Sequence, residues 1–263
     1  TLGAEYMGYM ANDRTAVFLG NGGGPIVEPI EKSNTYGIGV NWSKDVLFKE
    51  MQWYADVFYT QFANKVVFDF DGSTDTLLIG SGGSYPNIQE RILYSPYSIS
   101  AQVGGQYELF HRTMIKASYR YQDVKQRDLT AFYASGAIED YFKLEEVILN
   151  VPHLIYLGAS YSGRKGMGIE LNATYNSSQR LPLVGYAKRS PAFTMLNGQI
   201  SKEGRAFGQF YIGIQNALNV RQLDPIVGGN LPFDGGFDAS IVWGPIMGRQ
   251  IYAGWRYDLK FQE

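Results

Sequence analysis

Three aspartates lie close together in the sequence at Asp69, Asp71 and Asp75, around the glycine at position 72. Carboxylates that alternate around a glycine turn can offer oxygen ligands to Ca²⁺. The stretch lacks the distal bidentate glutamate that completes a calcium-binding loop. A polar transition from strand to loop is therefore the favoured interpretation, and a calcium site in an extracellular loop is the alternative.

The chain has two histidines and no cysteine. The absence of cysteine excludes a disulfide framework and cysteine-ligated metal sites. His111 is expected at a turn and His153 at the start of a strand, and neither has a predicted Ser or Cys nucleophile as a partner. We therefore expect no catalytic residues and no enzyme activity. The formal net charge of −2 argues against a nucleic-acid partner.

The elements that would position any site are strands. Aromatic residues make up 15% of the chain, with 20 Tyr and 15 Phe, and there are 31 Gly. This composition favours strands and turns. Residues 251–261 alternate without a break, and successive side chains of a strand point to opposite faces. One face carries Ile251, Ala253, Trp255, Tyr257, Leu259 and Phe261, and the other carries Tyr252, Gly254, Arg256, Asp258 and Lys260.

The same alternation recurs along the chain, which predicts about ten strands. It is clear in residues 36–42, 53–59, 99–108, 115–121, 155–161, 169–176 and 210–215, and weaker in residues 194–201.

The connections between these segments alternate in length. Short ones are expected near residues 43–48, 109–112, 163–166 and 202–204, and long ones near 10–32, 72–87, 125–150, 178–190 and 217–248.

This organisation predicts an all-β fold, a transmembrane antiparallel β-barrel. No apolar run approaches the roughly 20 residues that a membrane helix needs, whereas a barrel crosses lipid with short alternating segments. Outer-membrane barrels have short periplasmic turns and long extracellular loops, so the C-terminus is expected in the periplasm. A soluble β-sandwich or propeller would also alternate, but it would have shorter strands and would not need an aromatic on nearly every apolar face.

Several motifs resemble those of TonB-dependent outer-membrane receptors. Residues 216–222 resemble a strand end of the form N-L-F-N-x-R, and residues 248–257 resemble the closing strand G-R-x-Y-Y-A-G-x-R-Y. Residues 31–37, 56–64, 118–121 and 190–193 also fit, and residues 237–246 resemble Bacteroidetes members in particular. The resemblance covers nearly the whole chain in order. It departs at the end, where Gln262 and Glu263 follow the expected terminal aromatic.

The resemblance implies that residues 1–263 are the C-terminal part of a barrel of about 22 strands. The plug domain and the N-terminal strands are absent from this chain, and Thr1 is expected to be a processed or truncated start. An isolated set of ten strands would leave two open edges, which are not viable in lipid. The alternatives are a complete small outer-membrane barrel that acts as a protease or adhesin, and a receptor-like barrel used as a scaffold in an outer-membrane complex.

The resemblance also implies a function and partners. Such receptors sit in the outer membrane of Gram-negative bacteria and import a scarce nutrient when TonB acts on the plug. The implied partners are TonB through the absent N-terminal part, outer-membrane lipid and LPS, a nutrient, and in some members a surface lipoprotein. The nutrients in the family are siderophores, haem, cobalamin, glycans and peptides, and nothing in the chain selects one.

Further candidate residues follow from these positions. We expect the long loops to bind substrate, with Tyr133, Tyr141, Phe142, Phe233 and Phe237 as candidates, although these aromatics could equally pack the loops together. Outward Trp255, Tyr257, Leu259 and Phe261 look like the C-terminal insertion signal of such barrels. The charges expected inside the barrel either contact the plug or transport path or pair with one another along the wall; they are Lys116, Arg120, Glu170, Arg256, Asp258 and Lys260.

Overall fold

The computed structural model describes residues 3–5, 32–47, 49–64, 96–127, 144–181, 188–204, 208–223, 225–226 and 242–257. Nine long strands and two strands of three residues account for most of this part of the chain. The long strands are β2 (Lys32–Val46), β3 (Lys49–Asn64), β4 (Tyr97–Phe110), β5 (Thr113–Arg127), β7 (His153–Ser162), β8 (Met167–Asn176), β9 (Phe193–Gly204), β10 (Gly208–Gln215) and β11 (Gln250–Arg256); the short ones are β1 (Gly3–Glu5) and β6 (Leu144–Glu146).

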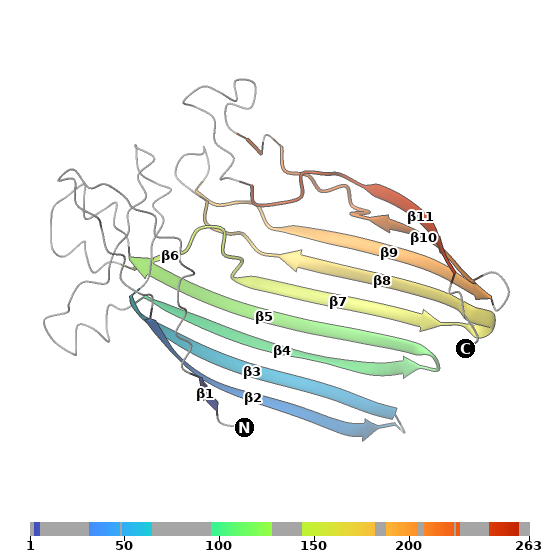
Figure 1. The fold of residues 1–263 in the computed structure, drawn as a ribbon, viewed down its shortest axis with the longest axis horizontal. Helices are drawn as coiled ribbons and strands as arrows, with labels where there is room; N and C mark the ends of the chain where they lie inside the picture. Colours follow the sequence, from blue (N-terminus) through green and yellow to red (C-terminus); the bar gives the residue numbers. More distant parts are fainter. Residues whose placement is uncertain are drawn as a thin grey trace, which may run out of the picture.

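All of these strands belong to one antiparallel sheet (Figure 1). Its order is β1-β2-β3-β4-β5-β7-β8-β9-β10-β11, and β6 pairs with β5 beside this path. Each long strand therefore pairs with the next long strand in the sequence. The path does not close within the described residues, because β1 pairs only with β2 and β11 only with β10.

The connections β2–β3, β4–β5, β7–β8 and β9–β10 lie at one end of the sheet, which we call the turn end (Figure 1). The opposite end, where the longer connections leave the strands, is the loop end. The β7–β8 connection is a single 3-10 turn, Arg164–Gly166. Leu47 and Arg112 lie at hairpin tips with positive φ angles of 50° and 67°, as tight hairpin turns require.

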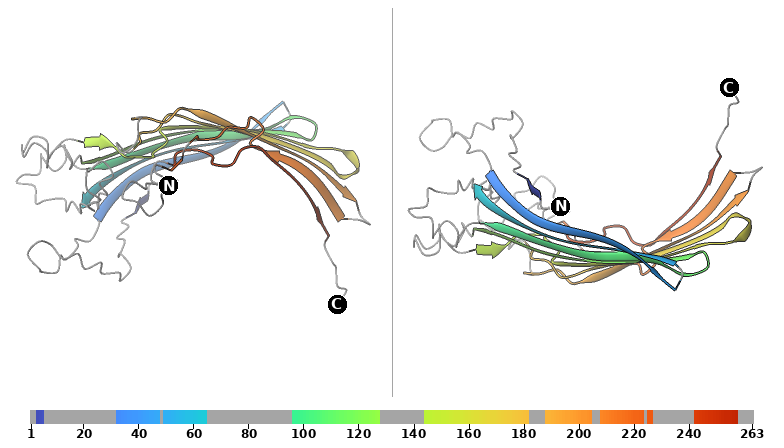
Figure 2. Two further views of the ribbon diagram at one scale, coloured as in Figure 1. Left: turned by 90° about the horizontal axis from the view of Figure 1, so that it is seen from above. Right: turned by 90° about the horizontal axis from the view of Figure 1, so that it is seen from below.

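The sheet is one curved layer (Figure 2). Residues predicted to alternate do alternate in exposure: along β7 the side chains switch between exposed and half-buried at almost every position. The more apolar set is the more exposed one, which is the reverse of a soluble sheet that packs its apolar side on a core.

The described part of the chain has almost no hydrophobic core. Leu181, at 7% exposure, is the one large hydrophobic side chain that is buried within the described residues. No helix within the described ranges is long and apolar enough to cross a membrane. Backbone hydrogen bonds between neighbouring strands are the main contacts within the sheet. The apolar side chains therefore need an apolar environment that the sheet itself does not provide.

The strands are longer than their apolar pattern predicted, and some connections are correspondingly shorter. The connection predicted at residues 43–48 is reduced to residues 47–48, because β2 continues to Val46 and β3 begins at Lys49. Residues 202–204, predicted as a turn, lie in β9, which continues to Gly204. Charged residues extend these strands beyond the apolar stretch. The two three-residue strands were not predicted, and residues 258–261 of the predicted last strand lie outside the described residues.

Candidate functional site

One face of the sheet is apolar across all of its long strands, and we call it the apolar face. The register places Ile38 opposite Val57, and Val57 opposite Ala101. In the strands near the β11 edge of the sheet, the register places Ile200 opposite Ile212 on the same face. These side chains remain exposed: Leu157 is 53% exposed and Ile212 is 55% exposed. Soluble monomers rarely expose a contiguous apolar surface of this kind.

Aromatic residues form two rows along the apolar face. The row nearer the turn end includes the directly paired Trp42 and Trp53. In the same row the rings of Phe210 and Trp255 are stacked, with centroids 6.0 Å apart. The row nearer the loop end includes the directly paired Tyr36 and Tyr59, and it continues with Tyr97, Tyr121 and Tyr175.

The two aromatic rows are separated by an apolar stretch of each strand. Tyr36 and Trp42 are six residues apart on β2, which corresponds to about 20 Å along the strand at roughly 3.3 Å per residue. Outer-membrane barrels carry an apolar band about 25 Å tall between two aromatic girdles, on strands tilted by roughly 35–45°. With such a tilt the two rows lie about 15 Å apart in height, so the apolar face has the same order of aromatic row, apolar band and aromatic row, over a smaller height.

The opposite side of the sheet, which we call the polar face, is held by side-chain hydrogen bonds across strands. Gln102 Nε2 donates to Tyr54 Oη at 3.0 Å, and Tyr252 Oη donates to Gln199 Oε1 at 3.0 Å. Asn197 Nδ2 donates to Asn172 Oδ1 at 2.9 Å. All of these side chains are half-buried.

Aromatic rings on the polar face lie directly over glycines of the neighbouring strand. Tyr211 pairs with Gly254 and Gly213 pairs with Tyr252, so the two strands exchange rings over glycines. A Cβ at Gly213 would lie 2.3 Å from Tyr252 Cζ, and one at Gly254 would lie 2.3 Å from Tyr211 Oη. Only glycine leaves room for the rings at these positions. The positions of the two tyrosine rings on the polar face therefore depend on these glycines.

Charged residues on the polar face include those that the sequence placed there. Lys116, Arg120 and Glu170 lie on it, and Arg256 lies opposite Gln209. Within the described residues, Arg120 Nε is buried and has no hydrogen-bond partner. Both interpretations of these charges, contact with a plug or transport path and ion pairing along the wall, stay predictions. The other two predicted members of this set, Asp258 and Lys260, lie outside the described residues.

A compact polar platform lies at the loop end between β10 and β11. Asn216 is 2% exposed and has a φ of 50°, a backbone conformation that asparagine tolerates. Its side chain accepts from Val220 N at 2.9 Å and donates to the carbonyls of Val220 and Met247 at 2.7 and 3.2 Å. Asn219 Oδ1 accepts from Arg249 N at 2.9 Å. The two C-terminal motifs, 30 residues apart in the sequence, thus bind each other directly.

The same platform extends to β8 and β9. Gln222 Oε1 accepts from the backbone N–H groups of Trp243 and Gly244, at 2.9 and 3.2 Å. Gln179 Nε2 donates to the Trp243 carbonyl at 2.8 Å. The ring of Trp243 lies 5.7 Å from that of Phe193.

An ion pair between Arg189 and Glu146 borders the platform at 2.7 Å. The hydrogen bonds that Arg189 donates to the Glu146 carboxylate raise the pKa of the Arg189 guanidinium, which is ordinarily protonated in any case. A second pair joins Arg180 and Glu145. These contacts give the bases of the long connections a fixed position.

Several predicted site residues fall outside the described residues. These are the loop aromatics Tyr133, Tyr141, Phe142, Phe233 and Phe237, the aspartates Asp69, Asp71 and Asp75, and Leu259 and Phe261 of the insertion strand. Trp255 and Tyr257 are described, and they are 58% and 48% exposed. The described ranges contain no cluster of three or more ligating side chains that could hold a metal ion.

The two histidines lie where the sequence placed them. His111 is in the β4–β5 turn, where Arg112 Nε donates to its Nε2 at 3.2 Å. His153 begins β7 on the apolar face, and its Nδ1 lies 2.8 Å from Tyr119 Oη. Its ring also lies 5.3 Å from that of Tyr121. His153 is thus part of the loop-end aromatic row.

No protein-family model matches the chain, and no curated protein matches it. Among solved structures, the ferric-catecholate import receptor Fiu of E. coli K12, in its closed form, matches with a TM-score of 0.55 and 13% sequence identity. The match covers 86% of this chain and 27% of the receptor. The chain thus spans about a quarter of that receptor's length. The likeness confirms the predicted fold class, an antiparallel all-β sheet that matches part of a receptor barrel.

Proposed function

We propose that the chain is part of the barrel wall of a TonB-dependent outer-membrane transporter that imports a scarce nutrient. The observation that carries the proposal is the pair of opposite faces on one curved antiparallel sheet. The motif resemblance supports the class of protein, its action through TonB and the plug, and a Bacteroidetes-like affiliation. The structural likeness to an import receptor supports the fold on which that function would rest.

The apolar face supports contact with lipid. It is apolar between two aromatic rows. Tyrosine and tryptophan are enriched at the membrane–water interface, where one end of the ring contacts water. The short connections at the turn end are assigned to the periplasm, as in outer-membrane barrels generally. In this proposal the loop end lies outside the cell, in contact with LPS, and β11 runs toward the periplasm.

The polar face supports a filled or wet interior. Arg120 Nε is buried without a hydrogen-bond partner within the described residues, and an unpaired buried polar group is costly. A plug domain from outside this chain would supply partners for such groups. The path of the sheet ends at β1 and β11, whose outer edges require further strands in lipid. Both features favour part of a larger plugged barrel over a small barrel closed by this chain.

The loop platform supports ligand capture outside the membrane. Buried Asn216 and Gln222 and the ion pair of Arg189 with Glu146 fix the bases of the long connections. Loops with fixed bases can present variable residues to a ligand, and functional residues often lie on such loops. The proposal assigns no catalytic chemistry to His111 or His153. Any surface lipoprotein partner would also act at this end.

Cysteine labelling tests the membrane assignment, because the chain has no native cysteine. Glu170 and Leu171 are adjacent on β8, point to opposite faces and are both exposed on the isolated sheet. In membranes that carry the full-length protein, Glu170→Cys should react with a water-soluble maleimide and Leu171→Cys should not. Equal reaction of the two variants would contradict a lipid-contacting apolar face.

A growth experiment tests transport. Cells that lack the full-length protein should lose growth on one limiting nutrient among iron chelates, haem, cobalamin, glycans and peptides. Loss of TonB in the parent strain should produce the same defect. If the protein resides in the outer membrane but its loss changes no TonB-dependent uptake, a scaffold role would replace transport.

A further inference from the structure

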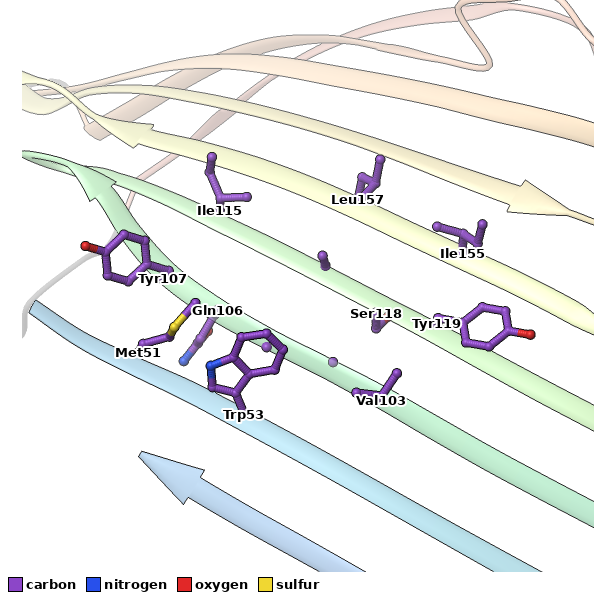
Figure 3. A pocket seen from close by; sticks show the side chains of 13 residues that line it. Met51, Trp53, Val103, Gln106, Tyr107, Ile115, Ser118, Tyr119, Ile155 and Leu157 are labelled. Atoms are coloured by element: carbon purple, nitrogen blue, oxygen red, sulfur yellow. The ribbon is translucent and has the colours of Figure 1, made fainter. Parts of the chain in front are cut away.

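A hollow of about 340 Å³ opens on the apolar face between β3 and β7 (Figure 3). Its floor is the cross-strand pair Gly105 and Ala117. Larger side chains stand around this floor, and Figure 3 shows them on the neighbouring strands. Those that form the walls are Trp53, Tyr107, Ile115, Tyr119 and Leu157.

The backbone keeps the floor of the hollow low. A Cβ at Gly105 would lie 2.7 Å from the backbone carbonyl oxygen of Gln52 and 3.4 Å from the Trp53 ring. A backbone atom cannot move aside as a flexible side chain can, so position 105 is restricted to glycine by the β3–β4 ladder. The floor of the hollow at Gly105 is therefore set by the backbone of the sheet and not by a side-chain rotamer.

The hollow runs along the strands toward a cationic hairpin tip. Tyr107 and Ile115 pair at its turn-end limit, and Arg112 lies three residues beyond Ile115, which is about 10 Å along an extended chain. Arg112 and His111 are both exposed.

The charge of Arg112 is not neutralised by a carboxylate within the described part of the chain. Its main-chain N–H, and not its side chain, donates to Glu108 at 2.9 Å, and Glu108 itself pairs with Lys49. The guanidinium donates to His111. An anionic group at the membrane boundary would neutralise the charge of Arg112.

We propose that the hollow binds one acyl chain of a phospholipid whose phosphate group lies at Arg112. This inference rests on the proposed location of the apolar face in a bilayer. Within lipid there is no hydrophobic gain from burying an acyl chain, so selective retention must come from close van der Waals packing and from the headgroup. The walled hollow supplies the packing and Arg112 supplies the charge.

A titration of the delipidated full-length protein with palmitoyl-oleoyl phosphatidylglycerol, read by native mass spectrometry, tests the site. The wild-type protein should show one saturable lipid. Ala117→Phe fills the floor from an exposed position and should abolish this event. Ala253→Phe is the matched control, because Ala253 is also exposed on the apolar face but lies on β11; it should bind as the wild type does.

The headgroup contact has its own pair of variants. Arg112→Asn removes the charge and keeps a residue that tolerates the positive φ, and it should weaken binding about five-fold. Arg164→Asn at the β7–β8 turn should leave binding unchanged. Diacylglycerol, which has the chains but no phosphate, should bind equally to the wild type and to Arg112→Asn.

The outcomes separate this proposal from the proposed function. Saturable binding that persists in Ala117→Phe, or that is absent from the wild type, would overturn the lipid site while Leu171→Cys stays protected from the maleimide. A reactive Leu171→Cys would instead overturn the bilayer location itself. Heat-modifiable migration of each variant on gels confirms that it has folded.

Discussion

The apolar and polar faces are built from the same strands, but different features fix their side chains. On the apolar face, large side chains such as Leu157 and Ile212 are more than half exposed. On the polar face, rings lie over glycines and amides bond across strands. Outside the hollow over Gly105, the apolar face requires only apolar surroundings, whereas the polar face requires side chains of a particular shape. Four substitution experiments test this distinction, ordered by expected effect.

The largest effect is expected from a charge in the middle of the apolar face. Leu157→Arg should lower the free energy of unfolding by about 2–4 kcal/mol, the cost of arginine at the midplane of a barrel wall. Urea unfolding of the full-length protein in lipid vesicles measures this. Ser160→Arg is the control on the same strand, because Ser160 lies on the polar face opposite Glu170. Equal losses in the two variants would remove the distinction between the faces.

The next effect is expected where a ring lies over a glycine. Gly213→Ala should cost roughly 1–3 kcal/mol, because the new methyl group overlaps the ring of Tyr252. The same unfolding assay applies. Tyr252→Ala should suppress the cost of Gly213→Ala in the double variant, and this coupling is the direct measure of the contact.

The apolar face provides the matched control for this glycine. At Gly198 a Cβ would meet the movable Cδ2 of Leu171 at 2.9 Å, so Gly198→Ala should cost less than Gly213→Ala. Additive effects of Gly213→Ala and Tyr252→Ala would show that ring shape is not what the polar face specifies.

A smaller effect is expected from removing one hydrogen-bonding amide. Asn197→Ala should lower the free energy of unfolding by about 1 kcal/mol, because Asn197 links Asn172 to the backbone N–H of Asn216.

The matched variant on the apolar face is Ile212→Ala. It should lower the free energy of unfolding by less than the roughly 2–5 kcal/mol of a core truncation, because lipid can fill the space. A core-like cost for Ile212→Ala, measured by unfolding in vesicles, would show that another protein surface packs on this face.

The smallest effect is expected at the exposed ion pair of the loop end, which belongs to neither face. Arg189→Gln should change stability by only about 0.2–1 kcal/mol, as exposed ion pairs do. High salt should shrink the difference further. A double-variant cycle with Glu146→Gln gives the coupling energy. If the coupling energy of Arg189 with Glu146 exceeded that of Gly213 with Tyr252, side-chain interactions would be more specific at the loop end than on the polar face.

The strands were predictable because alternation reports the faces directly. Each patterned segment, from residues 36–42 to residues 251–256, lies in a strand of the sheet. The ends of the strands were less predictable, since Lys44, Asp45, Lys49 and Glu50 resemble a turn by composition. They are in fact paired in the ladder of β2 and β3 beyond the apolar stretch. The strands β1 and β6 have three residues each, too few for a pattern.

The site was predictable only in part. The motif residues Asn216 and Arg249 could be recognised as a resemblance, but their common platform depends on a fold that brings residues 216–222 and 242–249 together. The rings over Gly213 and Gly254 depend on register, which no single segment carries. The hollow over Gly105 is lined by four strands, β3, β4, β5 and β7, so no pattern within one segment of sequence could have shown it.

The different ends of the sheet have a consequence for how such a wall can change over evolution. The short hairpins at the turn end set the register of β2 with β3 and of β4 with β5, because a slip by one residue would move every side chain to the wrong face. The loop end does not have to set register. Insertions and exchanges of sequence there leave each ladder intact, and long surface loops are inexpensive in chain entropy. The loop sequences at this end can therefore change while the strand pairing of the sheet stays the same.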